Sequence, residues 1–77
     1  MSGDEPVGSA RRSADALALA LEDVGFDVGH AFPMLGQGFD RGGAPIVELG
    51  SVAPPVAAAL AGVLAEAARC GVMVSDG

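Results

Sequence analysis

The sequence predicts a small α+β domain in which a β-hairpin packs on two helices. Apolar residues have helical spacing in residues 10–24 and 55–69, and the residues between them have the composition of two strands and a turn. A chain of 77 residues is long enough for one domain only. We therefore expect a flexible leader at residues 1–8 and a single α-β-β-α domain at residues 9–77.

The first predicted helix runs from Ala10 to about Val24. Ser9 is suited to the N-cap position, and Gly25 lies where a glycine commonly ends a helix. The apolar residues alternate at spacings that place them on one narrow stripe. These residues are Ala10, Ala14, Leu17, Leu21 and Val24.

Two strands are predicted between the helices. Residues 26–35 alternate between two sets of side chains, as in a strand, and residues 44–50 form the second strand of the hairpin. The glycine-rich residues 36–43 have the composition of the connecting loop. Pro33 and Pro45 cannot donate a hydrogen bond to a sheet, so we expect each at an edge or a strand end.

The last predicted helix, Pro55 to Arg69, is apolar around its whole circumference. Opposite its main apolar stripe lie the small residues Ala58, Gly62 and Ala65, where a surface helix carries polar residues. Small residues allow a second helix to come close. We expect cover on this side either from the first helix of the same chain or from a second copy, which makes the domain a homodimer.

Gly71 is suited to end this helix. Residues 72–74 after it have two interpretations, a short third strand or a frayed tail. Cys70 continues the apolar stripe, so we expect a buried and inert thiol. As the single cysteine of the chain, it cannot form an internal disulfide, and no cluster of metal-ligating residues is present in the sequence. Oligomerisation is the remaining way to stabilise so small a domain.

Composition and charge narrow the classes of function. A formal net charge of −6 argues against binding to a nucleic-acid backbone, which needs many Lys and Arg side chains. The acidic start lacks the features of a signal peptide, and no apolar run suits a membrane span, so we expect a cytoplasmic protein that binds no membrane. The abundance of Ala and Gly, with Arg as the only basic residue type besides one His, is typical of GC-rich bacterial genomes.

Several polar and exposed residues are candidates for contact with a partner. Glu22 and Asp23 lie at the C-terminal end of the first helix, where the helix dipole favours cations, and Asp27 follows closely. A basic partner would compensate these charges; the alternative is a solvated helix end. Leu19 lies opposite the apolar stripe, and Phe39 lies in the predicted loop, where contact with a partner could order it.

A second hypothesis places a small-ligand pocket between the hairpin and the helices, near His30, Phe32 and Glu48. Hairpin pairing would bring Glu48 close to His30, the one side chain that ordinarily titrates near neutrality. A His–Glu pair alone defines no reaction, and a metal site needs more ligands. The other interpretation of His30 is a half-buried structural residue.

The sequence contains no constellation of nucleophile, base or metal ligands, so we expect no enzyme, no cofactor and no metal. The first functional hypothesis is a small interaction or regulatory module, acting as a homodimer or bound to another protein. The alternative is the small-ligand-binding domain. The candidate partner-binding residues are Leu19, Glu22, Asp23, Asp27, Phe39, Ala58, Gly62 and Ala65.

Overall fold

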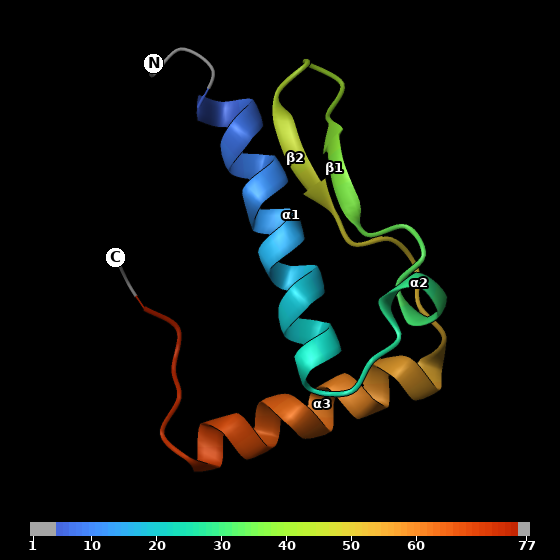
Figure 1. The fold of residues 1–77 in the computed structure, drawn as a ribbon, viewed down its shortest axis with the longest axis vertical. Coiled ribbons are helices and arrows are strands. Elements are labelled where there is room, and N and C mark those ends of the chain that lie inside the picture. Colours follow the sequence, from blue (N-terminus) through green and yellow to red (C-terminus); the bar gives the residue numbers. More distant parts are fainter. Residues whose placement is uncertain (1–4, 76–77) are drawn as a thin grey trace.

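The computed structural model describes the backbone of residues 5–75 and the side chains of residues 7–75 (Figure 1). Within this range the chain forms three helices and one antiparallel two-stranded sheet, which confirms the predicted small α+β architecture. The elements in chain order are α1 (Glu5–Asp23), α2 (Val28–Ala31), β1 (Gly36–Phe39), β2 (Pro45–Glu48) and α3 (Pro54–Arg69).

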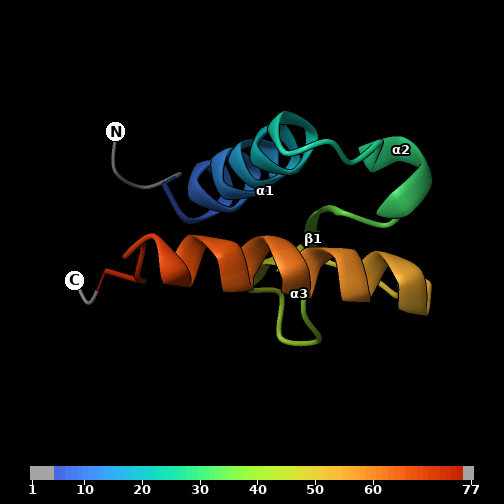
Figure 2. The same cartoon turned by 90° about the horizontal axis from the view of Figure 1, so that it is seen from below.

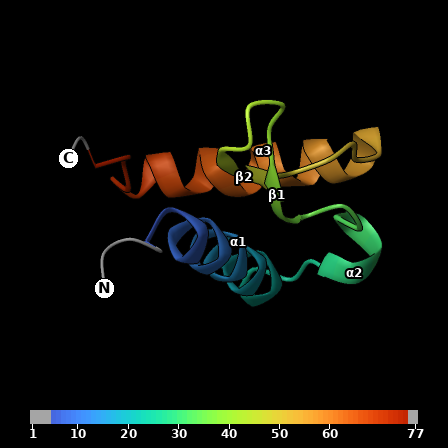
Figure 3. The same cartoon turned by 90° about the horizontal axis from the view of Figure 1, so that it is seen from above.

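The helix α1 packs against the hairpin. It contacts both strands and α2, and Figures 2 and 3 show it on one side of the sheet. Its buried residues Ala10, Ala14 and Leu21 belong to the predicted stripe, whereas Leu17 and Val24 of the same stripe are 36% and 52% exposed. The helix begins at Glu5, so the second half of the predicted leader is helical. Residues 1–4 of the leader lie outside the described residues.

Both long helices end as the sequence predicts. At the end of α1, Gly25 has a φ of 108°, its N–H donates to the carbonyl of Glu22 (3.0 Å), and the N–H of Phe26 donates to the carbonyl of Leu21 (3.0 Å). This pair of bonds is a Schellman motif, in which a glycine adopts the left-handed conformation that other residues avoid. The helix α3 ends in the same way at Gly71.

The prediction of a strand over residues 26–35 is wrong. These residues form α2 and a turn, in which the carbonyl of Asp27 accepts the N–H of Ala31 (2.7 Å). Phe26 and Phe32 make an edge-to-face contact with ring centroids 5.4 Å apart. In a strand the same two residues would lie about 20 Å apart, so only a folded-back segment allows the contact. It also allows Phe32 to be buried at 7% exposure.

The strand β1 forms instead within the residues predicted as the loop. It pairs with β2 in a register that places Gly36 opposite Glu48 and Phe39 opposite Pro45. The connection is a tight turn, because the N–H of Gly43 donates to the carbonyl of Asp40 (3.0 Å). The prediction for the second strand is confirmed, and Pro45 begins β2, where the loss of a donor is tolerated.

The helix α3 is attached to the rest of the chain along one stripe only. Figure 1 shows it crossing below the end of α1, and it is not among the elements in close contact with the hairpin. None of its residues is buried. The half-buried side chains of its inner stripe are Val56, Leu60, Val63 and Ala67. Residues 72–75 after the helix form no strand.

The chain is more open than a compact domain of its size. Its accessible surface is 5628 Å², against about 4,250 Å² for a compact monomer of this mass. Its radius of gyration is 14.1 Å, against about 11.5 Å for a compact chain of this length. The buried hydrophobic side chains among the described residues are Ala10, Ala14, Leu21 and Phe32. Such a small core leaves much apolar surface in contact with water.

Replacing Gly50 with alanine is expected to lower the free energy of unfolding by about 1–3 kcal/mol. Gly50 has a φ of 73°, and a Cβ there would meet the Cβ of Met34, which belongs to the turn before β1. The measurement is chemical or thermal unfolding followed by circular dichroism.

The matched control is Gly38→Ala, whose new Cβ would meet the carboxylate of Glu48 at 2.7 Å. That carboxylate ends a flexible, exposed side chain and can move aside, so this variant should lose less than about 1 kcal/mol. Equal losses in the two variants would contradict the close packing of Gly50 against Met34.

Candidate functional site

One side of α3 is exposed along the whole length of the helix. Successive residues turn by about 100° around a helix, which places one set of residues opposite the inner stripe. We call this set the outer face of α3; all of its members are exposed, and they are Pro54, Ala58, Ala61, Gly62, Ala65 and Arg69. Figure 2, seen from below, shows α3 in front of the other elements with nothing over it.

The structure tests one of the two covers predicted for the small residues of this helix, namely the first helix. Ala58, Gly62 and Ala65 are all exposed, and a Cβ added at Gly62 would meet no atom within 4 Å. The helix α1 packs on the hairpin instead. The alternative in which the first helix covers this face is therefore wrong, and the face has no partner within the described chain.

Charge is almost absent from this face. The charged residues of α3 are Glu66 and Arg69, and they form an exposed ion pair with each other. The outer face from Pro54 to Ala65 therefore carries no charge and no polar side chain. A partner on this face gains apolar contact and close backbone approach, with little electrostatic attraction.

Exposed apolar residues continue beyond α3. Leu64 on its flank is 60% exposed, and Val72, Met73 and Val74 after the helix are 64%, 83% and 96% exposed. Cys70 is exposed as well, so the prediction of a buried thiol is wrong. No other described element covers the C-terminal end of α3. The apolar stripe is therefore exposed where it reaches Cys70.

The other candidate partner-binding residues lie on different elements. Leu19 is 60% exposed on α1, and Phe39 is 55% exposed at the end of β1. Glu22, Asp23 and Asp27 are exposed at the end of α1 and in the segment after it. The structure does not bring these five residues onto the outer face of α3, so they belong to separate parts of the surface.

The residues of the predicted ligand pocket are dispersed. His30 is exposed on α2, whereas Phe32 is buried against Phe26. Glu48 is exposed at the end of β2, and its carboxylate lies beside Gly38. The placement of His30 on a strand is thus wrong, and no hydrogen bond or ion pair joins His30 to Glu48.

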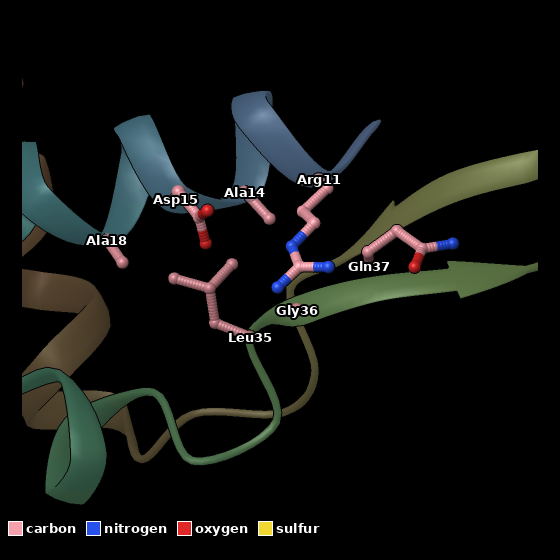
Figure 4. A pocket seen from close by; sticks show the side chains of 7 residues that line it. All are labelled: Arg11, Ala14, Asp15, Ala18, Leu35, Gly36 and Gln37. Atoms are coloured by element: carbon pink, nitrogen blue, oxygen red, sulfur yellow. The ribbon is translucent and has the colours of Figure 1, made fainter. Parts of the chain in front are cut away.

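A different cleft lies between α1 and β1, with a volume of 310 Å³ (Figure 4). Figure 4 shows the side chain of Arg11 extending toward β1 and that of Leu35 pointing toward α1. No pattern in the sequence indicated this cleft, because it forms where α1 meets residues that were predicted as a strand end and a loop. Its lining residues are Arg11, Ala14, Asp15, Ala18, Leu35, Gly36 and Gln37.

Residues 5–75 contain neither a candidate metal cluster nor a candidate membrane span. No group of three His, Cys, Asp or Glu side chains in that range is placed to hold a metal ion. Nor does any helix in the same range have the length and apolar character needed to cross a membrane.

Comparison with known proteins found no matching family model and no matching protein among curated sequences or solved structures. A proposal about function therefore depends on the physical properties of the chain itself.

Replacing Phe32 with alanine is expected to destabilise the fold by about 3–4 kcal/mol. Its ring is 7% exposed and contacts Phe26. The change removes one of the few buried side chains and leaves a cavity. The loss should be visible as a lower midpoint of urea unfolding.

Phe39→Ala is the matched control, because the same ring at 55% exposure contributes much less to the core. Its unfolding midpoint should stay close to that of the unchanged protein. A loss for Phe39→Ala as large as that for Phe32→Ala would show that Phe39 is also part of the core, and not a surface residue.

Proposed function

We propose that this protein is a small non-enzymatic interaction or regulatory module that binds another polypeptide chain through the outer face of α3. The observation that carries the proposal is a helix of 16 residues with no buried side chain and an outer face without charge up to Ala65. Soluble proteins rarely leave such a contiguous apolar surface in water unless it is an interaction site.

The area of the exposed surface supports the same proposal. The accessible surface exceeds that of a compact monomer by about 1,400 Å². This excess belongs to the whole chain; burial of its apolar part against a partner would contribute about 25 cal/mol per Å², from which the cost of association is subtracted. A partner on α3 would thus supply the apolar contacts that the small core lacks.

The acidic residues fit this proposal as a second contact. Glu22, Asp23 and Asp27 are exposed, and no ion pair involves them within the described residues. These carboxylates would attract a basic segment of a bound protein. They lie on α1 and in the segment after it, so this contact would be separate from the one on α3. The composition of the chain and its single exposed cysteine fit a bacterial protein in the reducing environment of the cytoplasm.

The cleft between α1 and β1 favours a second candidate, the binding of a small ligand. Its 310 Å³ lies at the small end of the range for ligand sites. Arg11, Asp15 and Gln37 supply a cation, an anion and an amide, which would suit a small zwitterionic molecule. Binding there predicts that Arg11→Ala abolishes the thermal shift caused by such a ligand, whereas substitutions on α3 leave it unchanged.

Site-specific photo-crosslinking in cells is the experiment that tests the interaction module. A photoreactive phenylalanine analogue in place of Ala65 lies on the outer face of α3. The same analogue in place of Ala16 lies on α1, where the alanine is also exposed. We expect the probe at position 65 to form a discrete adduct with a polypeptide, identified by mass spectrometry, and the probe at position 16 to form none.

Absence of any adduct at position 65, or the same adducts at both positions, would contradict the proposed function. An adduct at position 16 alone would instead locate the interaction surface on α1, near Leu19.

A further inference from the structure

We propose that the cleft between α1 and β1 binds a free α-amino acid with an aliphatic side chain, whose carboxylate pairs with Arg11 and whose ammonium group pairs with Asp15. This inference rests on the second candidate function, ligand binding in the cleft, because it names the class of ligand. It does not depend on the outer face of α3, since no residue of α3 lines the cleft. Three properties of the cleft support it: two unpaired charges, their opposite signs, and an apolar remainder of the lining.

Two side chains of opposite charge enter the cleft from α1 without pairing with each other. Arg11 and Asp15 are four residues apart, a spacing at which a helix ordinarily allows an ion pair. Neither side chain forms a hydrogen bond or an ion pair with another described residue. Figure 4 shows both extending from α1 toward β1. The cleft therefore presents a cation and an anion whose hydrogen-bonding groups are available to a ligand.

The order of the two residues and the packing of α1 explain why the pair stays open. The cation precedes the anion along the helix, which is the less favourable order for a pair with this spacing. The guanidinium of Arg11 extends instead toward Gly36 at the start of β1 (Figure 4). The docking of α1 on the hairpin thus separates two charges that lie on the same side of the helix.

The two charges together select a zwitterion. A purely anionic ligand would approach Asp15 on a chain of formal net charge −6, and a purely cationic ligand would approach Arg11. A molecule with both charges forms a charge-assisted hydrogen bond at each side chain. In an α-amino acid the carboxylate and the ammonium group are attached to one carbon atom. It can therefore bridge two side chains whose Cβ atoms lie about 6 Å apart on one helix.

The rest of the lining is largely apolar and lies beyond Asp15. Ala14 is buried and Ala18 is half-buried on α1, and Leu35 points toward them from the start of β1 (Figure 4). Ala18 is about one helical turn after Asp15, so a bound amino acid would direct its side chain toward Ala18 and Leu35. The volume of 310 Å³ equals that of about ten water molecules, which is enough for a molecule of the size of leucine.

Titration of the full, isotope-labelled chain with leucine, followed by NMR, tests the inference. The backbone amides of Gly36 and Gln37 should shift and saturate with a dissociation constant on the order of 1 mM, because both charges are exposed and the cleft is open. The amides of Ala58 and Gly62 on α3 should not shift. Alanine should bind about tenfold more weakly, since it lacks three apolar carbon atoms of leucine.

Each charged side chain is tested with a ligand that lacks the matching charge. Arg11→Gln should weaken leucine binding about tenfold or more. The same variant should bind leucinamide, which has no carboxylate, at least as tightly as the unchanged protein does, because a repulsive cation has been removed. Asp15→Asn should weaken leucine binding and should bind N-acetyl-leucine, which has no ammonium group, at least as tightly as the unchanged protein.

The matched control is Arg41→Gln, which removes the same charge from an exposed residue in the turn between the strands. It should leave the dissociation constant for leucine within about twofold of the original value. All three substitutions are at exposed positions, so the fold should survive them, and circular dichroism checks this point.

Three outcomes would overturn the inference. The first is the absence of a saturable shift with leucine at concentrations up to about 20 mM. The second is an equal effect of Arg11→Gln and Arg41→Gln on leucine binding. The third is a variant that weakens the binding of leucine and of the ligand without the matching charge to the same extent, since the altered side chain would then not contact that charge.

The outcomes also separate this inference from the candidate function on which it rests. A different small molecule could shift Gly36 and Gln37 in the unchanged protein and lose its effect in Arg11→Gln, while leucine has none. That result would overturn the amino acid as ligand and preserve ligand binding in the cleft. The adduct at position 65 tests the outer face of α3 separately, whatever the cleft binds.

Discussion

The contact between α1 and the hairpin is the constraint on which the rest of the structure depends. The helix has one narrow apolar stripe, in which Ala10, Ala14 and Leu21 are buried, and a single stripe can cover a single surface. This stripe of α1 packs on the hairpin. A hairpin of two strands is only marginally stable in water by itself, so it needs this contact. The helix α3 is then left with its inner stripe half-buried and no element to cover its outer face.

Signals that act within a few residues allowed the sequence to predict much of this fold. The ends of α1 and α3 were predicted at Gly25 and Gly71. A glycine in the left-handed conformation ends a helix through backbone hydrogen bonds between residues that are close in sequence. The strand β1 was not predicted, since Gly36 and Gly38 carry no side chain that indicates a strand. The strand β1 forms because its backbone pairs with β2, and the composition of residues 36–39 does not indicate this pairing.

The candidate site shows the same division between local and long-range information. The apolar circumference of α3 was visible in the sequence, and the structure shows that its outer face lacks a cover within the described chain. The predicted pocket assumed that His30 and Glu48 lie on paired strands, which the contact between Phe26 and Phe32 prevents by folding the segment back. The cleft beside Arg11 required the docking of α1 on β1, which no local pattern indicated.

The chemistry of the outer face also bears on the strength of the proposed contact. Alanine and glycine carry little apolar area per residue, so a partner on Ala58, Gly62 and Ala65 gains less apolar contact than it would on a face of leucines. These small residues allow the backbone of a partner helix to come close to α3. How close it comes depends on the fit between the two helices. We expect association through such a face to be weak and selective, and the stability that it adds to rise with the concentration of the partner. We therefore expect a bound partner to add stability to a fold whose own core is small.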